Sequence, residues 1–304
     1  MRVQGDQPDR PLGRMRLAVL GAGRVGLSLA AWTRAAGGEV TALLARSPAR
    51  AATRAAELLD PPPPARPIET FVDEPVEADV LLIAVSDPAL AEVADRLAAR
   101  LEAASASFGS TAWPGARVVL HTSGLFDRRI LEPLATCGLA TGSLHPLCAF
   151  PSALAAPRPH AVYAVDGAPA ALEAATHLAH AFGGRAVEID GSRRLLYHAG
   201  ATLAAGGVTT LLAVAEELVE RLELPAAVID GYLDLAQGAL EAARTRRPVA
   251  AAITGPAARG DTEVVERQLQ AFGEVAPEHA QLVRTLAEST RRQRCRSGNP
   301  TIDE

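Results

Sequence analysis

The stretch Met15-Arg-Leu-Ala-Val-Leu-Gly-Ala-Gly-Arg-Val-Gly26 decides the fold of this 304-residue chain. Its first half is an apolar run, which predicts a buried strand near residues 16–20, and residues 24–36 have the pattern of a helix. The turn between them reads GxGxxG, in the strand–turn–helix context that a dinucleotide-binding fingerprint requires. The alternative is a glycine-rich turn that holds no ligand.

Each position of this turn has a physical role in the dinucleotide interpretation. Gly21 suits the tight turn, Gly23 lets the backbone approach a pyrophosphate, and Gly26 lets the helix pack closely on the strand. Arg24 and Val25 open the helix, whose N-terminal N–H groups and positive potential favour a phosphate. These five residues are therefore predicted to bind the cofactor.

The segment after the second predicted strand, near 39–44, indicates which nicotinamide nucleotide is bound. NAD sites place Asp or Glu there, and residues 41–47 contain no acid. Arg46 and Ser47 follow the strand instead, and cationic and hydroxyl groups suit a 2′-phosphate. The sequence thus predicts NADP(H), the alternative being a solvated arginine on a turn.

Strands and helices alternate from this point to residue 190, as in a doubly wound, mostly parallel sheet. After residue 190 only helical patterns follow. We expect an α/β protein with an N-terminal Rossmann doubly wound sheet (15–190) and an all-helical C-terminal substrate and dimerisation domain (191–292), flanked by disordered segments 1–14 and 293–304. The expected strands are 16–20, 39–44, 79–85, 117–121, 140–144, 161–165 and 185–189, and the expected helices are 24–36, 48–59, 88–103, 127–136, 169–182, 192–222, 226–245, 262–273 and 276–292.

The composition excludes several classes of chemistry. The chain contains no lysine, so Schiff-base catalysis and a Walker-type phosphate lysine are impossible. A net charge of −5 argues against nucleic acid as a partner. No set of metal ligands is completed around His145 and Cys148, so we expect no metal.

The cellular location is predicted from cysteines and apolar segments. Three widely spaced cysteines and the absence of an apolar N-terminal core predict a cytoplasmic protein. Residues 195–215 carry no formal charge and are long enough to span a bilayer, but they lack flanking aromatic anchors. We therefore expect a buried, small-residue helix and no membrane partner.

Three loops at predicted strand ends carry reactive groups. In open α/β sheets, ligands bind outside the carboxyl ends of the strands. Ser86 and Asp87 follow one strand, and we expect them to contact the cofactor. His121 and Ser123 follow the next, and His145 follows a third. Each histidine alone is more often structural, but their convergence on one edge makes His145 the best candidate acid–base group.

The helical region adds two further candidates. Tyr197 and His198 lie near the start of the long predicted helix. Arg259 lies on a loop framed by Gly and Pro, where it suits a bidentate grip on a substrate carboxylate, and Asp261 after it suits a helix N-cap.

Six motifs together resemble a bacterial family of Rossmann-like proteins with an uncharacterised all-helical C-terminal domain. The resemblance covers about residues 15–275. It implies the superfamily of 6-phosphogluconate-dehydrogenase-like reductases, including pyrroline-5-carboxylate and ketopantoate reductases, whose members usually dimerise through the helical domain. The motifs are GAGRVG (21–26), SDPAL (86–90), HTSG (121–124), SLHPL (143–147), LYHAGA (196–201) and TGPAARGD (254–261).

A looser resemblance links His145-Pro146-Leu147 to the His-Pro-Met motif of prephenate and arogenate dehydrogenases. That resemblance implies catalytic roles for His145, Ser123 and His198, and a carboxylate-binding role for Arg259. The chain departs from the first family where members carry Asn on the long helix, because its single asparagine is Asn299.

The resulting hypothesis is an NADP(H)-dependent oxidoreductase that moves hydride to or from a small carboxylate-bearing carbonyl, alcohol or imine compound. His145 exchanges the proton, Ser123 orients or relays it, and His198, Arg259 and His121 position the substrate. The alternatives are a catalytically inactive NADP(H)-binding regulatory or scaffold protein and a prephenate-dehydrogenase-like oxidative decarboxylase. The long apolar helix also predicts a homodimer, because one small domain cannot cover it.

Overall fold

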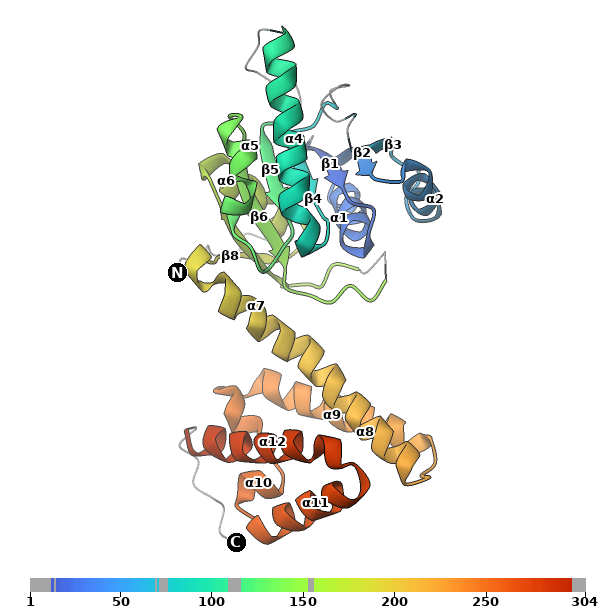
Figure 1. Ribbon diagram of the computed structural model, residues 1–304, viewed down its shortest axis with the longest axis vertical. Coiled ribbons are helices and arrows are strands. Elements are labelled where there is room, and N and C mark those ends of the chain that lie inside the picture. The colour runs from blue at the N-terminus through green and yellow to red at the C-terminus, as the bar shows by residue number, and fades with distance from the viewer. Residues whose placement is uncertain are drawn as a thin grey trace. The chain divides into compact units, whose positions relative to one another are not determined.

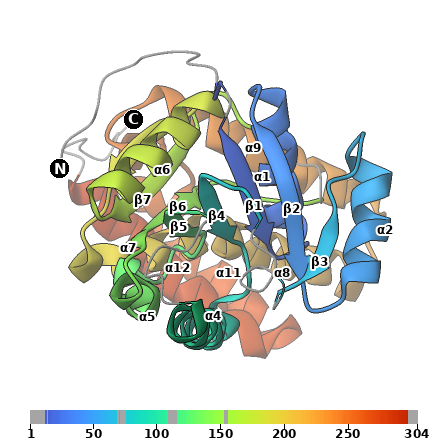
Figure 2. The ribbon, with the colours of Figure 1, turned by 90° about the horizontal axis from the view of Figure 1, so that it is seen from above.

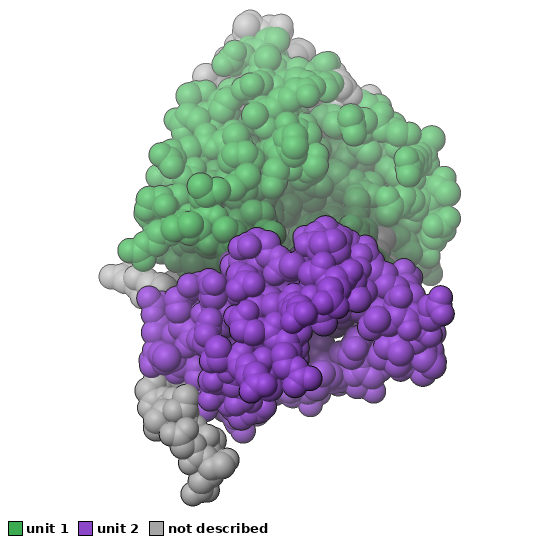
Figure 3. Space-filling view, turned by 60° about the horizontal axis from the view of Figure 1, so that its bottom comes forward, with its two compact units in different colours: residues 1–202 green, residues 203–304 purple. Residues whose placement is uncertain are grey.

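The computed structural model describes residues 12–13, 15–68, 70, 76–108, 116–152 and 156–296. The chain divides into two compact units, Met1–Thr202 and Leu203–Glu304, coloured separately in Figure 3. The expected division at residue 190 falls just before the long helix, and the division between the units falls inside it.

The first unit is built on one eight-stranded sheet of order β3-β2-β1-β4-β5-β6-β7-β8. Neighbouring strands are parallel except for the pair β6 and β7, which is antiparallel. The expected doubly wound α/β fold is therefore confirmed. The strands are β1 (Arg16–Leu20), β2 (Glu39–Ala45), β3 (Ala65–Pro67), β4 (Val80–Ile83), β5 (Val118–His121), β6 (Ala140–Pro146), β7 (Val162–Gly167) and β8 (Arg185–Glu188).

Helices cover both faces of this sheet (Figure 2). Because strand side chains alternate between the faces, Leu17 and Val19 of β1 pack in one apolar cluster and Ala18 and Leu20 in the other. The first cluster includes α1 (Arg24–Ala35), α2 (Pro48–Leu58) and α6 (Pro169–Ala181). The second includes α4 (Asp87–Phe108), the 3-10 turn η1 (Arg128–Leu131) and α5 (Glu132–Thr136). All seven expected strands are present.

The structure corrects three local expectations. The short strand β3 was not predicted, because three residues that end in proline carry almost no strand pattern. Leu12 belongs to the segment expected to be disordered, yet its side chain is buried in the first cluster and its N–H bonds the Ala36 carbonyl. The last helix continues to Arg296, so residues 293–296 are helical, whereas residues 1–11, 14 and 297–304 lie outside the described residues.

The long helix predicted over residues 192–222 is divided into several segments, of which α7 and α8 are labelled in Figure 1. It comprises the 3-10 turn η2 (Gly191–Arg193), α7 (Arg194–Thr202), the π-helical turn η3 (Leu203–Gly207) and α8 (Val208–Arg221). A π turn accommodates one extra residue in the helix and is frequent near functional sites. By length and composition, Gly191–Arg221 could cross a membrane, and only 6% of its most apolar window is buried within the described residues. The expectation that this helix is buried is therefore wrong for the single chain.

The second unit is all-helical in its described part, as predicted. After η3 and α8 come α9 (Ala227–Thr245), the 3-10 turn η4 (Val249–Ala252), α10 (Pro256–Arg259), α11 (Thr262–Val275) and α12 (Pro277–Arg296). Its buried side chains are few and include Val219 of α8, Ala258 of α10, and Val265 and Leu269 of α11.

The contact between α1 and β1 generates a stability prediction. A Cβ on Gly26 would lie 1.9 Å from the Gly21 carbonyl oxygen, which no real contact allows. We expect Gly26→Ala to lower the free energy of unfolding by about 1–3 kcal/mol or more, because backbone must move. Urea denaturation measures this. The control is Gly231→Ala on α9, where nothing lies within 4 Å and the change should stabilise by roughly 0.5–1 kcal/mol. Equal stability of Gly26→Ala and wild type would contradict the packing described.

Candidate functional site

The glycine turn between β1 and α1 has the geometry expected of a phosphate cradle. Gly21 has φ of +115°, and a Cβ there would lie 2.3 Å from the Ala84 carbonyl oxygen at the end of β4. A Cβ on Gly23 would meet nothing within 4 Å, so the space beside this backbone is open. Gly23 caps α1 without a side-chain hydrogen bond, which leaves the first-turn N–H groups without that partner. The turn thus presents backbone donors to open space.

A cleft of about 410 Å³ adjoins this turn. It is lined by the ends of β1, β2 and β4 and by the helices α2 and α4 that follow the last two. Four arginines and one acid, Glu92, stand among its lining residues, so the cleft suits an anion. The arginines are Arg46, Arg50, Arg54 and Arg96, and the other polar lining includes Ser47 and Ser86.

The cleft contains part of the predicted cofactor set. Gly21, Gly23, Arg46, Ser47 and Ser86 line it. Of the remaining four, Arg24 is exposed in the first turn of α1, Gly26 is buried beneath the turn, Val25 is partly buried, and Asp87 opens α4. The residues that line the cleft fit a dinucleotide phosphate: open backbone at Gly23, a helix N-terminus and several guanidinium groups.

A second polar group of residues lies at the end of β6. His145 Nδ1 and the Tyr197 hydroxyl of α7 are 2.8 Å apart and form a hydrogen bond. The ring of His198, the next residue on α7, lies edge-on to His145 with 6.0 Å between the ring centres. Gly124 permits this approach, since a Cβ there would lie 2.7 Å from atoms of both imidazoles. His198 Nδ1 is buried and has no partner among the described residues.

Burial controls the protonation of His145 and Tyr197. The pKa of His145 is lowered to about 4, first by burial, then by the positive charge of Arg194 and by His198. Burial raises the pKa of Tyr197 to about 12. At neutral pH both side chains are therefore uncharged, and the phenol keeps its proton.

His121 and Ser123 are occupied in holding the turn after β5. His121 is fully buried, its Nδ1 accepts the Ser123 N–H at 3.2 Å, and its Nε2 donates to the Asp127 carbonyl at 3.2 Å. Both ring nitrogens are thus used, and the pKa of His121 is lowered to about 3, chiefly by burial. The Ser123 hydroxyl accepts the N–H groups of Leu125 and Phe126, which leaves its own proton for another partner.

Two residues of this region were given no role by the sequence. The sequence assigns no role to Tyr197, although its place directly before the candidate His198 on the same predicted helix indicates that it lies near the same site. Arg194 was overlooked, because neighbouring arginines near a helix start normally face solvent. In the structure Arg194 is buried and bonds Ser123 and Ser143.

Arg259 belongs to the second unit and is paired locally. Its guanidinium bonds the Asp261 carboxylate at 2.9 and 3.0 Å, and 56% of its side chain is exposed. Asp261 precedes α11, but its side chain makes no capping hydrogen bond there. Arg259 is the last residue of α10, and two of its guanidinium nitrogens share one oxygen of Asp261, Oδ2, in an exposed ion pair.

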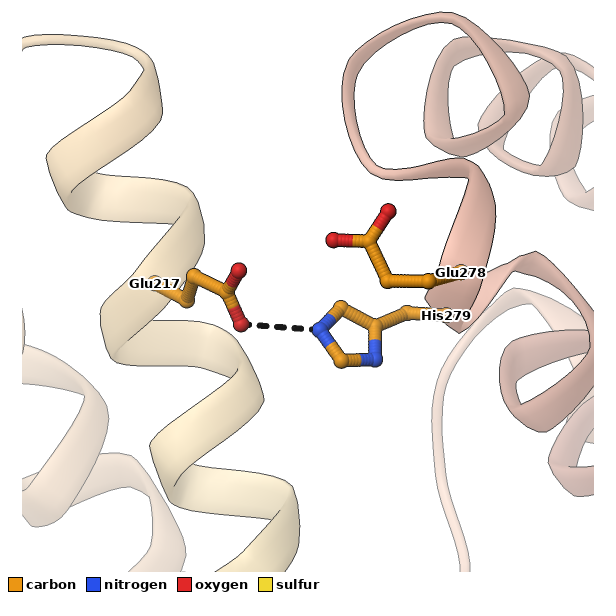
Figure 4. A group of neighbouring side chains, drawn as sticks. All are labelled: Glu217, Glu278 and His279. Atoms are coloured by element: carbon orange, nitrogen blue, oxygen red, sulfur yellow. Dashed lines mark hydrogen bonds and ion pairs between the residues drawn. The ribbon is translucent and has the colours of Figure 1, made fainter.

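The second unit also brings together Glu217 of α8 with Glu278 and His279 of α12 (Figure 4). Their ligand atoms lie within 4.8 Å of one another, as a metal site requires. However, Arg221 bonds both carboxylates as well as the Val275 carbonyl, and His279 Nε2 bonds Glu217 at 2.8 Å. The Arg221 guanidinium already supplies a positive charge to both carboxylates, so these residues form a network of ion pairs and hydrogen bonds that joins α8 to α12.

Comparisons with known proteins agree with this architecture. Residues 3–146 match a Rossmann-like domain, and residues 161–290 match a Domain of unknown function (DUF2520). The two matched segments follow one another along the chain. No curated protein matches it.

Three solved structures illustrate the shared fold. Protein TM1727 from Thermotoga maritima has a TM-score of 0.69 at 19% identity, with 93% of this chain and 100% of that chain covered. The reductive aminase from Aspergillus terreus in complex with NADPH and ethyl levulinate has a TM-score of 0.61 at 16% identity, with 92% of this chain and 94% of that chain covered. The Plasmodium falciparum pyrroline carboxylate reductase with NADP bound has a TM-score of 0.57 at 13% identity, with 92% of this chain and 98% of that chain covered. At these identities the likeness concerns the fold.

Proposed function

We propose that this protein is an NADP(H)-dependent oxidoreductase acting on a small carboxylate-bearing carbonyl, alcohol or imine compound. The observation that carries the proposal is the alignment of three neighbouring parallel strands. Ala84–Ser86 after β4 line the arginine-rich cleft, Ser123 follows β5, and His145 ends β6. A cofactor cleft and a histidine therefore share one edge of the sheet, where ligands of this fold class bind. The NADPH-bound and NADP-bound structures of similar fold support it.

The chain's own residues divide the binding task. Backbone N–H groups at Gly23, Arg24 and Val25 hold the pyrophosphate, and Arg46 and Ser47 hold the 2′-phosphate. Ser86 and Asp87 close the cofactor site from the end of β4. When bound, NADPH supplies the hydride.

Proton movement falls to His145. Because its imidazole is uncharged at neutral pH, it accepts the proton of an alcohol in the oxidative direction. In the reductive direction the uncharged ring donates a hydrogen bond from Nε2 to the substrate oxygen or nitrogen, and the proton that completes the alcohol or amine comes from solvent. Tyr197 orients the ring through Nδ1, which leaves Nε2 for the substrate.

The other candidates receive narrower roles. Ser123 offers its hydroxyl proton to the substrate or relays it, and His198, whose ring lies edge-on to His145, helps to position the substrate. We assign His121 to holding the turn after β5 instead of contacting substrate, because both of its nitrogens are used. Arg259 remains a candidate for the substrate carboxylate, provided that Asp261 releases it.

Substitution of His145 tests the proposed chemistry. We expect His145→Asn to lower turnover about 10²- to 10⁴-fold, the usual worth of a positioned acid–base group, while NADPH still binds. NADPH oxidation across a panel of keto acids and imines, beside a fluorescence binding titration, measures both. The control is His160→Asn, an exposed residue with φ of +60° that asparagine tolerates. Full turnover in His145→Asn would refute its role, and binding without turnover across the panel in wild type would favour the inactive regulatory protein.

Cofactor choice is tested at Arg46. We expect wild type to bind NADPH more tightly than NADH, and Arg46→Ala to lose about tenfold or more in NADPH affinity with little change for NADH. This follows because a charge-assisted bond to the 2′-phosphate exists only in NADPH. Isothermal titration calorimetry gives both constants, with Arg185→Ala, an exposed residue of β8 outside the cleft, as control. NADH binding as tight as NADPH binding would contradict the assignment.

We also propose that the protein is a homodimer that buries apolar side chains of the helical unit. Leu203 is 74% exposed and Leu235 is 72% exposed, and Leu222, Leu233 and Leu240 are each about half exposed. Exposed leucines at this density mark an interaction surface. Light scattering should give twice the mass of one chain, and a concentration-independent monomer would contradict the proposal.

A further inference from the structure

The described part of the chain buries one permanently charged side chain. Arg194, the first residue of α7, is 1% exposed, and every other buried polar residue described is a serine, threonine or histidine. Burial of a guanidinium is costly unless it is paired and fully hydrogen-bonded. The burial of the Arg194 guanidinium therefore calls for a structural or functional explanation.

Arg194 is held by groups that carry no negative charge. One terminal nitrogen donates to the Ser123 carbonyl at 3.3 Å, in the loop after β5, and the other donates to the Ser143 hydroxyl of β6. Its Nε is buried without a partner, and none of the described carboxylates forms an ion pair with it. Asp166 and Asp127 act on it only from a distance, and burial lowers its pKa. The positive charge is therefore not neutralised locally.

The bonds of Arg194 reach β6, which carries His145, and the loop that follows His121 of β5. His121 of β5 pairs in register with Ser143 of β6, and His145 lies two residues further along β6. Since side chains two residues apart point to the same face of a strand, Ser143 and His145 share a face. The bond from Arg194 to Ser143 therefore anchors α7 on the strand that carries His145.

Helix geometry links the contacts of Arg194 to the residues around His145. Residues three and four positions apart lie on one face of a helix, so Arg194, Tyr197 and His198 project together. With Arg194 bonded to the loop after β5 and to β6, Tyr197 reaches His145 Nδ1 and the ring of His198 lies against Gly124. No other described side-chain hydrogen bond or ion pair joins α7 to these two strands or to the loop after β5.

We propose that Arg194 is the positioning residue of this site, fastening α7 to the loop after β5 and to β6 so that Tyr197 and His198 are aligned on His145. Its charge has a second consequence for the same histidine. The groups that face His145 are Arg194, Tyr197 and His198 from α7 and His121 from β5. Of these, Arg194 is the one that is always positive, and it opposes protonation of His145.

The positive charge of Arg194 lowers the pKa of His145. The pKa of His145 is lowered from 6.5 to about 4, so the neutral ring is favoured, and loss of the Arg194 charge must raise that pKa. The activity part of the inference rests on the proposed function. The structural part does not, because alignment and titration can be measured without cofactor or substrate.

The test compares Arg194→Gln, which loses the charge, with Arg194→Lys, which keeps the charge but cannot span both partners. The control is Arg193→Gln, the exposed neighbour. Histidine titration is followed by NMR on ring-labelled full-length protein, with the His145 signal assigned from His145→Asn. Backbone hydrogen exchange is followed over residues 121–128 and 194–202.

We expect wild-type His145 to stay neutral down to about pH 4. In Arg194→Gln its pKa should rise by about one unit or more, and exchange should quicken in both segments. Arg194→Lys should keep the low pKa while exchange quickens, and Arg193→Gln should match wild type. If the enzyme turns over, Arg194→Lys should lower kcat and leave NADPH affinity unchanged.

A wild-type His145 that titrates near pH 6.5 would overturn the inference. So would a folded Arg194→Gln with unchanged titration and exchange. If Arg194→Gln does not fold, Arg194→Lys decides the question, because unchanged exchange in that variant would contradict the anchoring role. Absence of turnover in wild type would count against the proposed function and leave these readouts unaffected.

Discussion

The contact of Gly26 with the Gly21 carbonyl is the constraint on which the rest of the first unit depends. With any side chain at residue 26, α1 could not begin directly over the end of β1. That approach leaves the backbone at Gly23 facing open space and the first-turn N–H groups of α1 without a side-chain cap. The arginine-rich cleft forms against this turn because β2 and β4 flank β1 in the sheet. Close packing of two glycines thus creates the surface that a phosphate can reach.

Charge is distributed in the site in two ways. Near the cleft, arginines are accessible and numerous, as phosphate binding needs. Near His145 one arginine is buried, and burial together with that charge lowers the pKa of both His121 and His145. The absence of lysine makes every side-chain cation of this kind a guanidinium, whose planar donors can bond two partners at once, as Arg194 does with Ser123 and Ser143.

The sequence predicted the sheet well because parallel strands covered on both faces are continuous apolar runs, as in Val80–Ile83. It missed β3, whose three residues end in proline, and it placed Leu12 outside the core because one leucine among polar residues has no periodicity. For the site, the order of motifs indicated which strand ends carry polar groups. It could not separate His121, which is fully bonded, from His145, or show that Arg194 is buried while Arg193 is exposed. Those distinctions depend on tertiary contacts between α7 and the sheet.

The central claim is that one edge of the sheet holds both a phosphate-binding cleft and a reactive histidine that act on one ligand pair. A crystal structure of the protein with NADP⁺ bound tests this most directly. We expect the pyrophosphate at Gly23, the 2′-phosphate against Arg46 and Ser47, and the nicotinamide ring turned toward His145. A nucleotide bound outside the cleft, or a nicotinamide ring directed away from His145 in an ordered complex, would contradict it.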